Sequence, residues 1–209
     1  MNLGKYYIAS ALFSASRMGI GATTVIYMLS KGVSLGDVAI IKIVQAVVIF
    51  FTEVPSGIVA DKWGRKLSIQ ISCICAIFGF LSFILVPNFI GFSIAEVFNA
   101  LTISFWSGAF ESLAVDNTKA DKRESGFIQY FFHKINKYGA LAIMMAGLIG
   151  GWLGESNLIY PFYFSSTLML ISLIFITLKL PELRGKSFAS MEKLKIAMER
   201  IKSFCENLS

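Results

Sequence analysis

The chain has little of what most enzymes use for catalysis. Among its 209 residues is one histidine, His133, and of its three cysteines Cys73 and Cys75 stand within a long apolar run. These residues provide neither a histidine-based metal cluster nor a disulfide framework. We find no nucleophile–base pair and no glycine-rich phosphate-binding loop. The sequence therefore predicts that the protein is not an enzyme, with no catalytic residues, no cofactor and no metal site.

Charged residues are also scarce, at 15% of the chain, whereas hydrophobic residues make up 56%. About six apolar runs are long enough to cross a bilayer, which takes ~20 helical residues. They cover approximately residues 6–29, 38–60, 67–86, 89–115, 138–152 and 160–180. We therefore expect an all-α membrane protein whose residues 1–182 form a bundle of six transmembrane helices.

The net charge of +6 comes from short loops and from the C-terminal tail, so it does not predict nucleic-acid binding. Lys31 is the one cation in the loops assigned to the outside. The opposite loops carry Lys62, Arg65 and Lys66, and then Lys119, Lys122 and Arg123. Cationic loops stay in the cytoplasm. Both termini are thus predicted to be cytoplasmic, with the basic residues near the lipid head groups of the bilayer.

The tail, residues 183–209, differs in character from the rest of the chain. Its apolar residues recur at spacings of three and four, with Lys and Glu between them: Met191, Leu194, Met198, Ile201, Cys205 and Leu208. Ser190 is a suitable N-cap. This pattern predicts an amphipathic helix on or near the inner face of the membrane.

Several polar residues stand within the apolar runs. A charge in the bilayer centre costs ~2.5–3.5 kcal/mol on insertion scales, so each calls for a reason. Arg17 lies near the middle of the first run, in a polar stripe with Ser10, Ser14, Gly21 and Thr24. We expect Arg17 either to line a substrate pathway or to hold helices together through a salt bridge or a carbonyl contact.

The second and fourth runs add further candidates for a substrate pathway or for ion coupling: Gln45, Glu53, Glu96, Asn99 and Glu111. A desolvated carboxylate is a reasonable proton carrier, so Glu96 is a candidate for this role unless it simply faces water. Lys42 stands near the outer end of its run, where its long side chain is expected to reach water. In the fifth run, Gly147/Gly151 and Gly150/Gly154 are overlapping pairs that permit close helix contact.

A short charged loop, Gly57-Ile58-Val59-Ala60-Asp61-Lys62-Trp63-Gly64-Arg65-Lys66, joins the second and third runs. Gly64 supplies the backbone freedom that a sharp turn needs. Asp61 and Arg65 are four residues apart and suited to pair if the helix persists. Because an acid opposes the macrodipole at the C-terminal end of its helix, Asp61 calls for another stabilising group, such as the N-terminus of a neighbouring helix.

The pattern G-x-x-x-D-K-x-G-R-K resembles the signature loop of the major facilitator superfamily (MFS) of secondary transporters. Two other segments, Glu53-Val54-Pro55-Ser56 and the stretch from Ser107 to Asp116, resemble the drug and small-molecule exporters of this superfamily. The resemblance covers residues 1 to about 182. It implies the N-terminal half of a twelve-helix fold in a cell's plasma (inner) membrane, with the tail as the connector to a second half.

What this resemblance implies about function is efflux of a small molecule by alternating access, with a proton as the candidate coupled ion. It assigns motif or gating roles to Gly57, Asp61, Lys62, Gly64, Arg65, Lys66 and Asp116. In particular, it pairs Asp116 with Arg65 as a latch and places a helix N-terminus of the second half at Asp61. A separate six-helix chain or a second copy of this one would complete the transporter.

The sequence departs from the family in its fourth and fifth runs, which lack the arginine of many proton-coupled members and the Gly-Pro of the antiporter signature. The coupling ion, the direction and the substrate therefore stay open. The alternative function is that of a non-transporting six-span protein, either a truncated remnant or a regulatory partner of a full transporter.

Overall fold

The computed structural model describes residues 3–120 and 125–181, which form eight helices and no strand in these two ranges. The helices are α1 (Gly4–Met18), α2 (Thr24–Ser30), α3 (Leu35–Trp63), α4 (Arg65–Leu85), α5 (Phe89–Trp106), α6 (Ala109–Ala120), α7 (Ser125–Ser156) and α8 (Tyr160–Lys179). The amphipathic helix predicted in residues 183–209 and the basic residues Lys122 and Arg123 lie outside the described residues.

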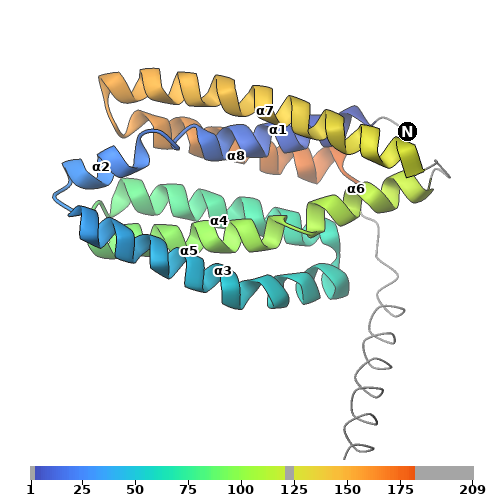
Figure 1. The fold of residues 1–209 in the computed structure, drawn as a ribbon, viewed down its shortest axis with the longest axis horizontal. Helices are drawn as coiled ribbons and strands as arrows, with labels where there is room; N and C mark the ends of the chain where they lie inside the picture. Colours follow the sequence, from blue (N-terminus) through green and yellow to red (C-terminus); the bar gives the residue numbers. More distant parts are fainter. Residues whose placement is uncertain (1–2, 121–124, 182–209) are drawn as a thin grey trace, which may run out of the picture.

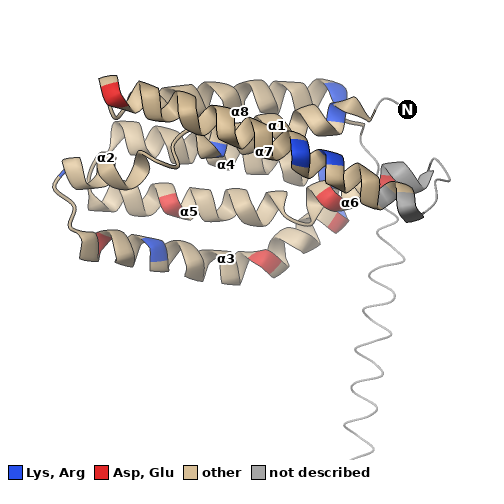
Figure 2. Cartoon of the chain, turned by 45° about the horizontal axis from the view of Figure 1, so that its top comes forward, with Lys and Arg blue, Asp and Glu red and all other residues tan. Residues whose placement is uncertain are grey.

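The long helices run roughly alongside one another in two layers (Figure 1). In one layer α1 packs against α7 and α8, and in the other α5 packs against α3 and α4. Contacts between α4 and α8 join the layers. We call the end of the bundle that carries the loop between α3 and α4 the motif end; Figure 2 shows charged residues gathered there.

Five segments of the described chain are long and apolar enough to cross a membrane: Leu35–Trp63, Arg65–Leu85, Phe89–Asp116, Gln129–Ser156 and Tyr160–Lys179. The predicted crossing at residues 6–29 is instead divided between α1 and α2. Gly19 lies at the division, and the hydroxyls of Thr23 and Thr24 donate to the carbonyl of Ile20 at 3.3 and 2.6 Å. Such hydroxyl bonds compete with a regular helix.

Two other predicted runs also differ from the structure. The fourth, expected as one helix, is interrupted at Ser107 and Gly108, because Gly108 has φ +56° and leaves the helical region. By contrast, α7 is a single helix of 32 residues that begins at Ser125, well before the fifth predicted run at residues 138–152. Lys134 stacks over the Tyr130 ring at 4.6 Å within α7, so the aromatic and basic residues there are compatible with a continuous helix.

Aromatic side chains fill the core on both sides of these interruptions. Towards the end opposite the motif end, the Phe162 ring lies 4.9 Å from both Tyr27 and Phe83. Across the break in the fourth run, Trp106 stacks on Phe13 of α1 at 3.5 Å and on Phe110 of α6 at 4.6 Å. These stacks hold α5 and α6 against α1 while the backbone between them changes direction.

Candidate functional site

The loop at the motif end consists of a single residue between two helices. Helix α3 ends at Trp63 and α4 begins at Arg65, with Gly64 between them at φ +112°. Side chains of L-amino acids rarely accept this conformation, so the glycine allows the helices to reverse direction within one residue. The sharp turn predicted at Gly64 is therefore present.

Arg65 forms an ion pair with Asp116 of α6. Its guanidinium also donates a hydrogen bond to the backbone carbonyl of Ser112 at 2.7 Å. One side chain thus ties the start of α4 to α6. The pairing of Arg65 with Asp61, four residues before it, does not occur, because Gly64 ends the helix between them.

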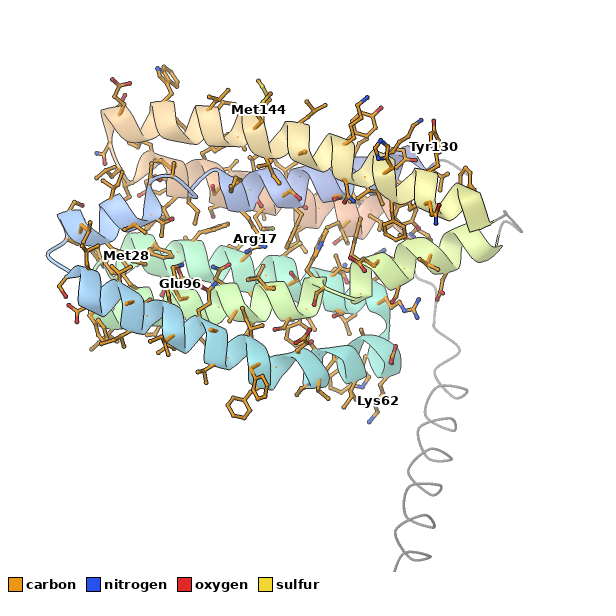
Figure 3. All side chains as sticks on the ribbon, viewed as in Figure 1. Arg17, Met28, Lys62, Glu96, Tyr130 and Met144 are labelled. Atoms are coloured by element: carbon orange, nitrogen blue, oxygen red, sulfur yellow. The ribbon has the colours of Figure 1, made fainter. Side chains whose placement is uncertain are left out.

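The other residues of the loop have different surroundings. Lys66 donates to the carbonyl of Thr177 on α8 at 2.8 Å, whereas Lys62 points outward from the bundle (Figure 3). A Cβ atom built on Gly57 would meet nothing within 4 Å, so no helix in the described ranges approaches this glycine closely. Asp61 is exposed and forms no ion pair with a residue that the structure describes.

A polar pocket of about 290 Å³ lies beside the loop. It is lined by α3, by the start of α4 and by the break between α5 and α6, and its lining includes Glu53, Asp61, Arg65, Ser107, Gly108 and Ser112. Ser104 also lines the pocket and shares a hydrogen bond of 2.8 Å with Thr52. Two carboxylates therefore face one concave surface together with several hydroxyls. Glu111, a further candidate, is exposed on α6.

A second polar cluster lies deeper in the bundle, around Glu96 of α5. The Glu96 side chain is only 1% exposed. Its Oε1 accepts a hydrogen bond from Lys42 Nζ at 2.6 Å, and its Oε2 accepts one from Asn99 Nδ2 at 3.0 Å. The sequence interpretation of Lys42 as a residue that reaches water was thus incomplete, because its amine bridges α3 to α5. The sequence signal that could have predicted this pair is the presence of opposite charges on two apolar runs, Lys42 on the second and Glu96 on the fourth.

Arg17 of α1 belongs to the same region. Its guanidinium lies 5.9 Å from the Phe13 ring centroid and interacts electrostatically with Glu96. Figure 3 shows both residues in the interior between the two layers. Arg17 and Asn99 line one small void of about 10 Å³. Gln45, also predicted for this pathway, is half-buried on α3.

The predicted polar stripe on the first run does not remain on one face. Ser10 and Thr24 are buried and Ser14 is half-buried, but Gly21 is exposed. The reason is the interruption after Met18, which ends the helical phase that placed these residues on one side. Within residues 3–120 and 125–181, moreover, no group of three or more His, Cys, Asp and Glu residues is arranged to hold a metal ion.

Comparisons with known proteins agree with this architecture. No family model matches the chain. It is 23% identical over 205 residues to the uncharacterized MFS-type transporter YxaM of Bacillus subtilis (strain 168), which covers 94% of this chain and 49% of YxaM. Among solved structures, the nucleoside transporter NupG matches with a TM-score of 0.76 and 18% identity, over 96% of this chain and 53% of NupG.

The chain therefore spans about half the length of both proteins. The match to NupG concerns the fold, and the match to YxaM extends the likeness to the sequence. Together they confirm the predicted resemblance: in sequence and in fold, this chain is similar to one half of an MFS-type transporter.

Proposed function

We propose that this chain is one six-span half of a secondary transporter that exports a small molecule by alternating access. The observation that carries the proposal is the match of nearly the whole chain to about half of two transporters. In such folds two halves rock against each other about a site near the middle of the bilayer. Here α1 and α2 together supply the first of six crossings of the plasma membrane. An even number of crossings brings both termini to the cytoplasmic side, where the motif end also lies.

The polar surface at the motif end supports the need for a second half. Glu53 and Asp61 are exposed on α3 and line the pocket of 290 Å³. Exposed carboxylates are costly against lipid, so they need water or a protein partner. A helix N-terminus of the second half, lying over Gly57, would place its positive dipole end near Asp61. This second half is a separate six-span chain segment or another copy of this one.

Arg65 and Asp116 are the gating pair in this proposal. Their ion pair holds α4 and α6 together at the cytoplasmic end, which favours the outward-facing state. The break at Ser107 and Gly108 lets α6 change its angle relative to α5 when that contact opens. Glu53 of α3, Glu96 of α5 and Glu111 of α6 are the candidates for proton coupling: Glu53 lines the pocket, Glu96 belongs to the deeper cluster and Glu111 is exposed on α6.

The test is flux into lipid vesicles that contain the chain together with a second half. Radiolabelled uridine is one probe, because the relative of known structure transports nucleosides, and radiolabelled benzoate is another. Saturable flux above that of protein-free vesicles supports the proposal. Correctly folded protein that moves no solute under any of these conditions would favour a non-transporting protein instead.

A further inference from the structure

We propose that the cluster of Arg17, Lys42, Glu96 and Asn99 binds an oxyanion, a carboxylate or a phosphate, with Arg17 as the residue that contacts its oxygens. This inference rests on the proposed transport function, because it names the substrate class of that function. It follows from the charges and hydrogen bonds of the cluster.

Both carboxylate oxygens of Glu96 already accept a hydrogen bond. One of its oxygens accepts from Lys42 at 2.6 Å and the other from Asn99 at 3.0 Å, and the side chain is 1% exposed. The carboxylate therefore neutralises Lys42. A cationic substrate would have to displace that lysine before it reached Glu96, so the cluster is poorly suited to a cation.

Arg17 is in the opposite situation. Among the residues that the structure describes, it forms no ion pair and donates no hydrogen bond; its contacts are the Phe13 ring at 5.9 Å and the longer-range attraction of Glu96. A guanidinium has five N–H donors in a planar fork that fits a carboxylate or a phosphate. These donors remain available to a ligand.

The net charge of the cluster points the same way. Arg17 and Lys42 each carry +1 and Glu96 carries −1, which leaves one uncompensated positive charge in the cluster. A monoanion restores neutrality there. The void beside Arg17 measures only about 10 Å³, roughly the room for one water, so the anion has to approach from the exposed side of this half-buried residue.

A tryptophan beside the cluster provides a direct signal. Trp106 stacks on Phe13 at 3.5 Å, and Phe13 is the ring next to Arg17. The other two tryptophans, Trp63 and Trp152, are both exposed. Replacing them with phenylalanine gives a full-length variant, the reporter chain, whose only tryptophan is Trp106. Fluorescence of the full-length reporter in lipid nanodiscs is then titrated at constant ionic strength with benzoate, inorganic phosphate or benzylammonium.

We expect saturable binding of an oxyanion, with the benzoate and phosphate arms showing which kind the site prefers, and no binding of benzylammonium. Arg17→Gln should weaken anion binding at least about tenfold, as the loss of a charged hydrogen bond implies. Glu96→Gln should strengthen it roughly threefold or more, because the cluster then carries +2. Lys137→Gln, which removes a positive charge from an exposed site on α7, serves as the matched control and should change nothing.

Three results would overturn the inference: no saturable signal with either anion in folded wild-type protein, equal benzoate binding by wild type and Arg17→Gln, or benzylammonium binding that Glu96→Gln abolishes. If Arg17→Gln does not fold, Arg17→Lys is tested in its place. Lysine keeps the positive charge but lacks the planar set of N–H donors, so this variant should bind benzoate several-fold more weakly than the wild type does. The titration needs no transport. Uridine flux in the vesicle assay without anion binding would therefore retain the proposed function and reject this substrate class.

Discussion

Gly150 of α7 lies directly against the backbone carbonyl of Gly19, at the point where the first crossing is interrupted. A Cβ atom at position 150 would collide with this carbonyl oxygen. Gly154, one turn later, is similarly close to the side chain of Thr23. Of the two overlapping glycine pairs in α7, it is therefore Gly150/Gly154 that brings the helices together, and Gly147/Gly151 faces open space.

Gly150→Ala is expected to destabilise the bundle by about 1–3 kcal/mol, because backbone atoms cannot move aside as a flexible side chain can. The thermal unfolding midpoint of the purified chain in detergent measures this. Gly151→Ala is the matched control: no atom lies within 4 Å of its added methyl group, and alanine favours a helix by up to about 1 kcal/mol. Equal midpoints for the two variants would mean that α7 does not pack on Gly19.

The ion pair between Arg65 and Asp116 predicts a charge-reversal result. Reversing either charge places like charges together, and transport with a second half present should fall about fivefold or more. The double reversal Arg65→Asp/Asp116→Arg should recover part of that loss. Recovery is partial because the hydrogen bond from Arg65 to the Ser112 carbonyl is lost.

Flux in the vesicle assay gives these values, with the reversal of Lys137 to Glu as a control outside the pair. A double variant as inactive as the product of the two single effects would show that the two residues do not act together.

Lys42 and Glu96 should respond unequally to substitution. Lys42→Met leaves the buried carboxylate without its cation and is expected to cost about 1–3 kcal/mol. Glu96→Gln should cost less, because Lys42 is 43% exposed and can turn to water. In Lys42→Met/Glu96→Gln the amide carries no charge, so much of the loss should return. The free energies of unfolding of the wild type, the two single variants and the double variant, measured by chemical denaturation, test this. If the effects of the two substitutions simply add, Lys42 and Glu96 are not coupled.

The sequence and the family resemblance predicted two features of the motif end, the turn at Gly64 and the pairing of Arg65 with Asp116, but the pairing of Asp61 with Arg65 does not occur. Gly64 takes the conformation expected of a glycine in a one-residue turn, and Arg65 meets Asp116. Both results depend on features close in sequence or carried by the family pattern. The roles assigned to the motif and pathway residues remain proposals.

The interruptions could not be predicted in the same way. Neither Gly19–Thr23 nor Ser107–Gly108 carries a charge, so each hydrophobic run looks continuous even where the helix ends. The first break lies against Gly150, which is distant in sequence. Likewise, the pairing of Lys42 with Glu96 depends on how α3 and α5 are rotated towards each other, and spacing along one helix carries no information about that rotation.

The dependence of flux on the number of chains in a vesicle tests the central claim most directly. Fluorescently labelled chains are reconstituted at ratios from one to several per vesicle, counted by stepwise photobleaching, and assayed for uridine and benzoate flux. We predict no flux from vesicles that hold a single chain, and flux only when a second copy or a complementary six-span half is present. Flux from single chains would contradict the account.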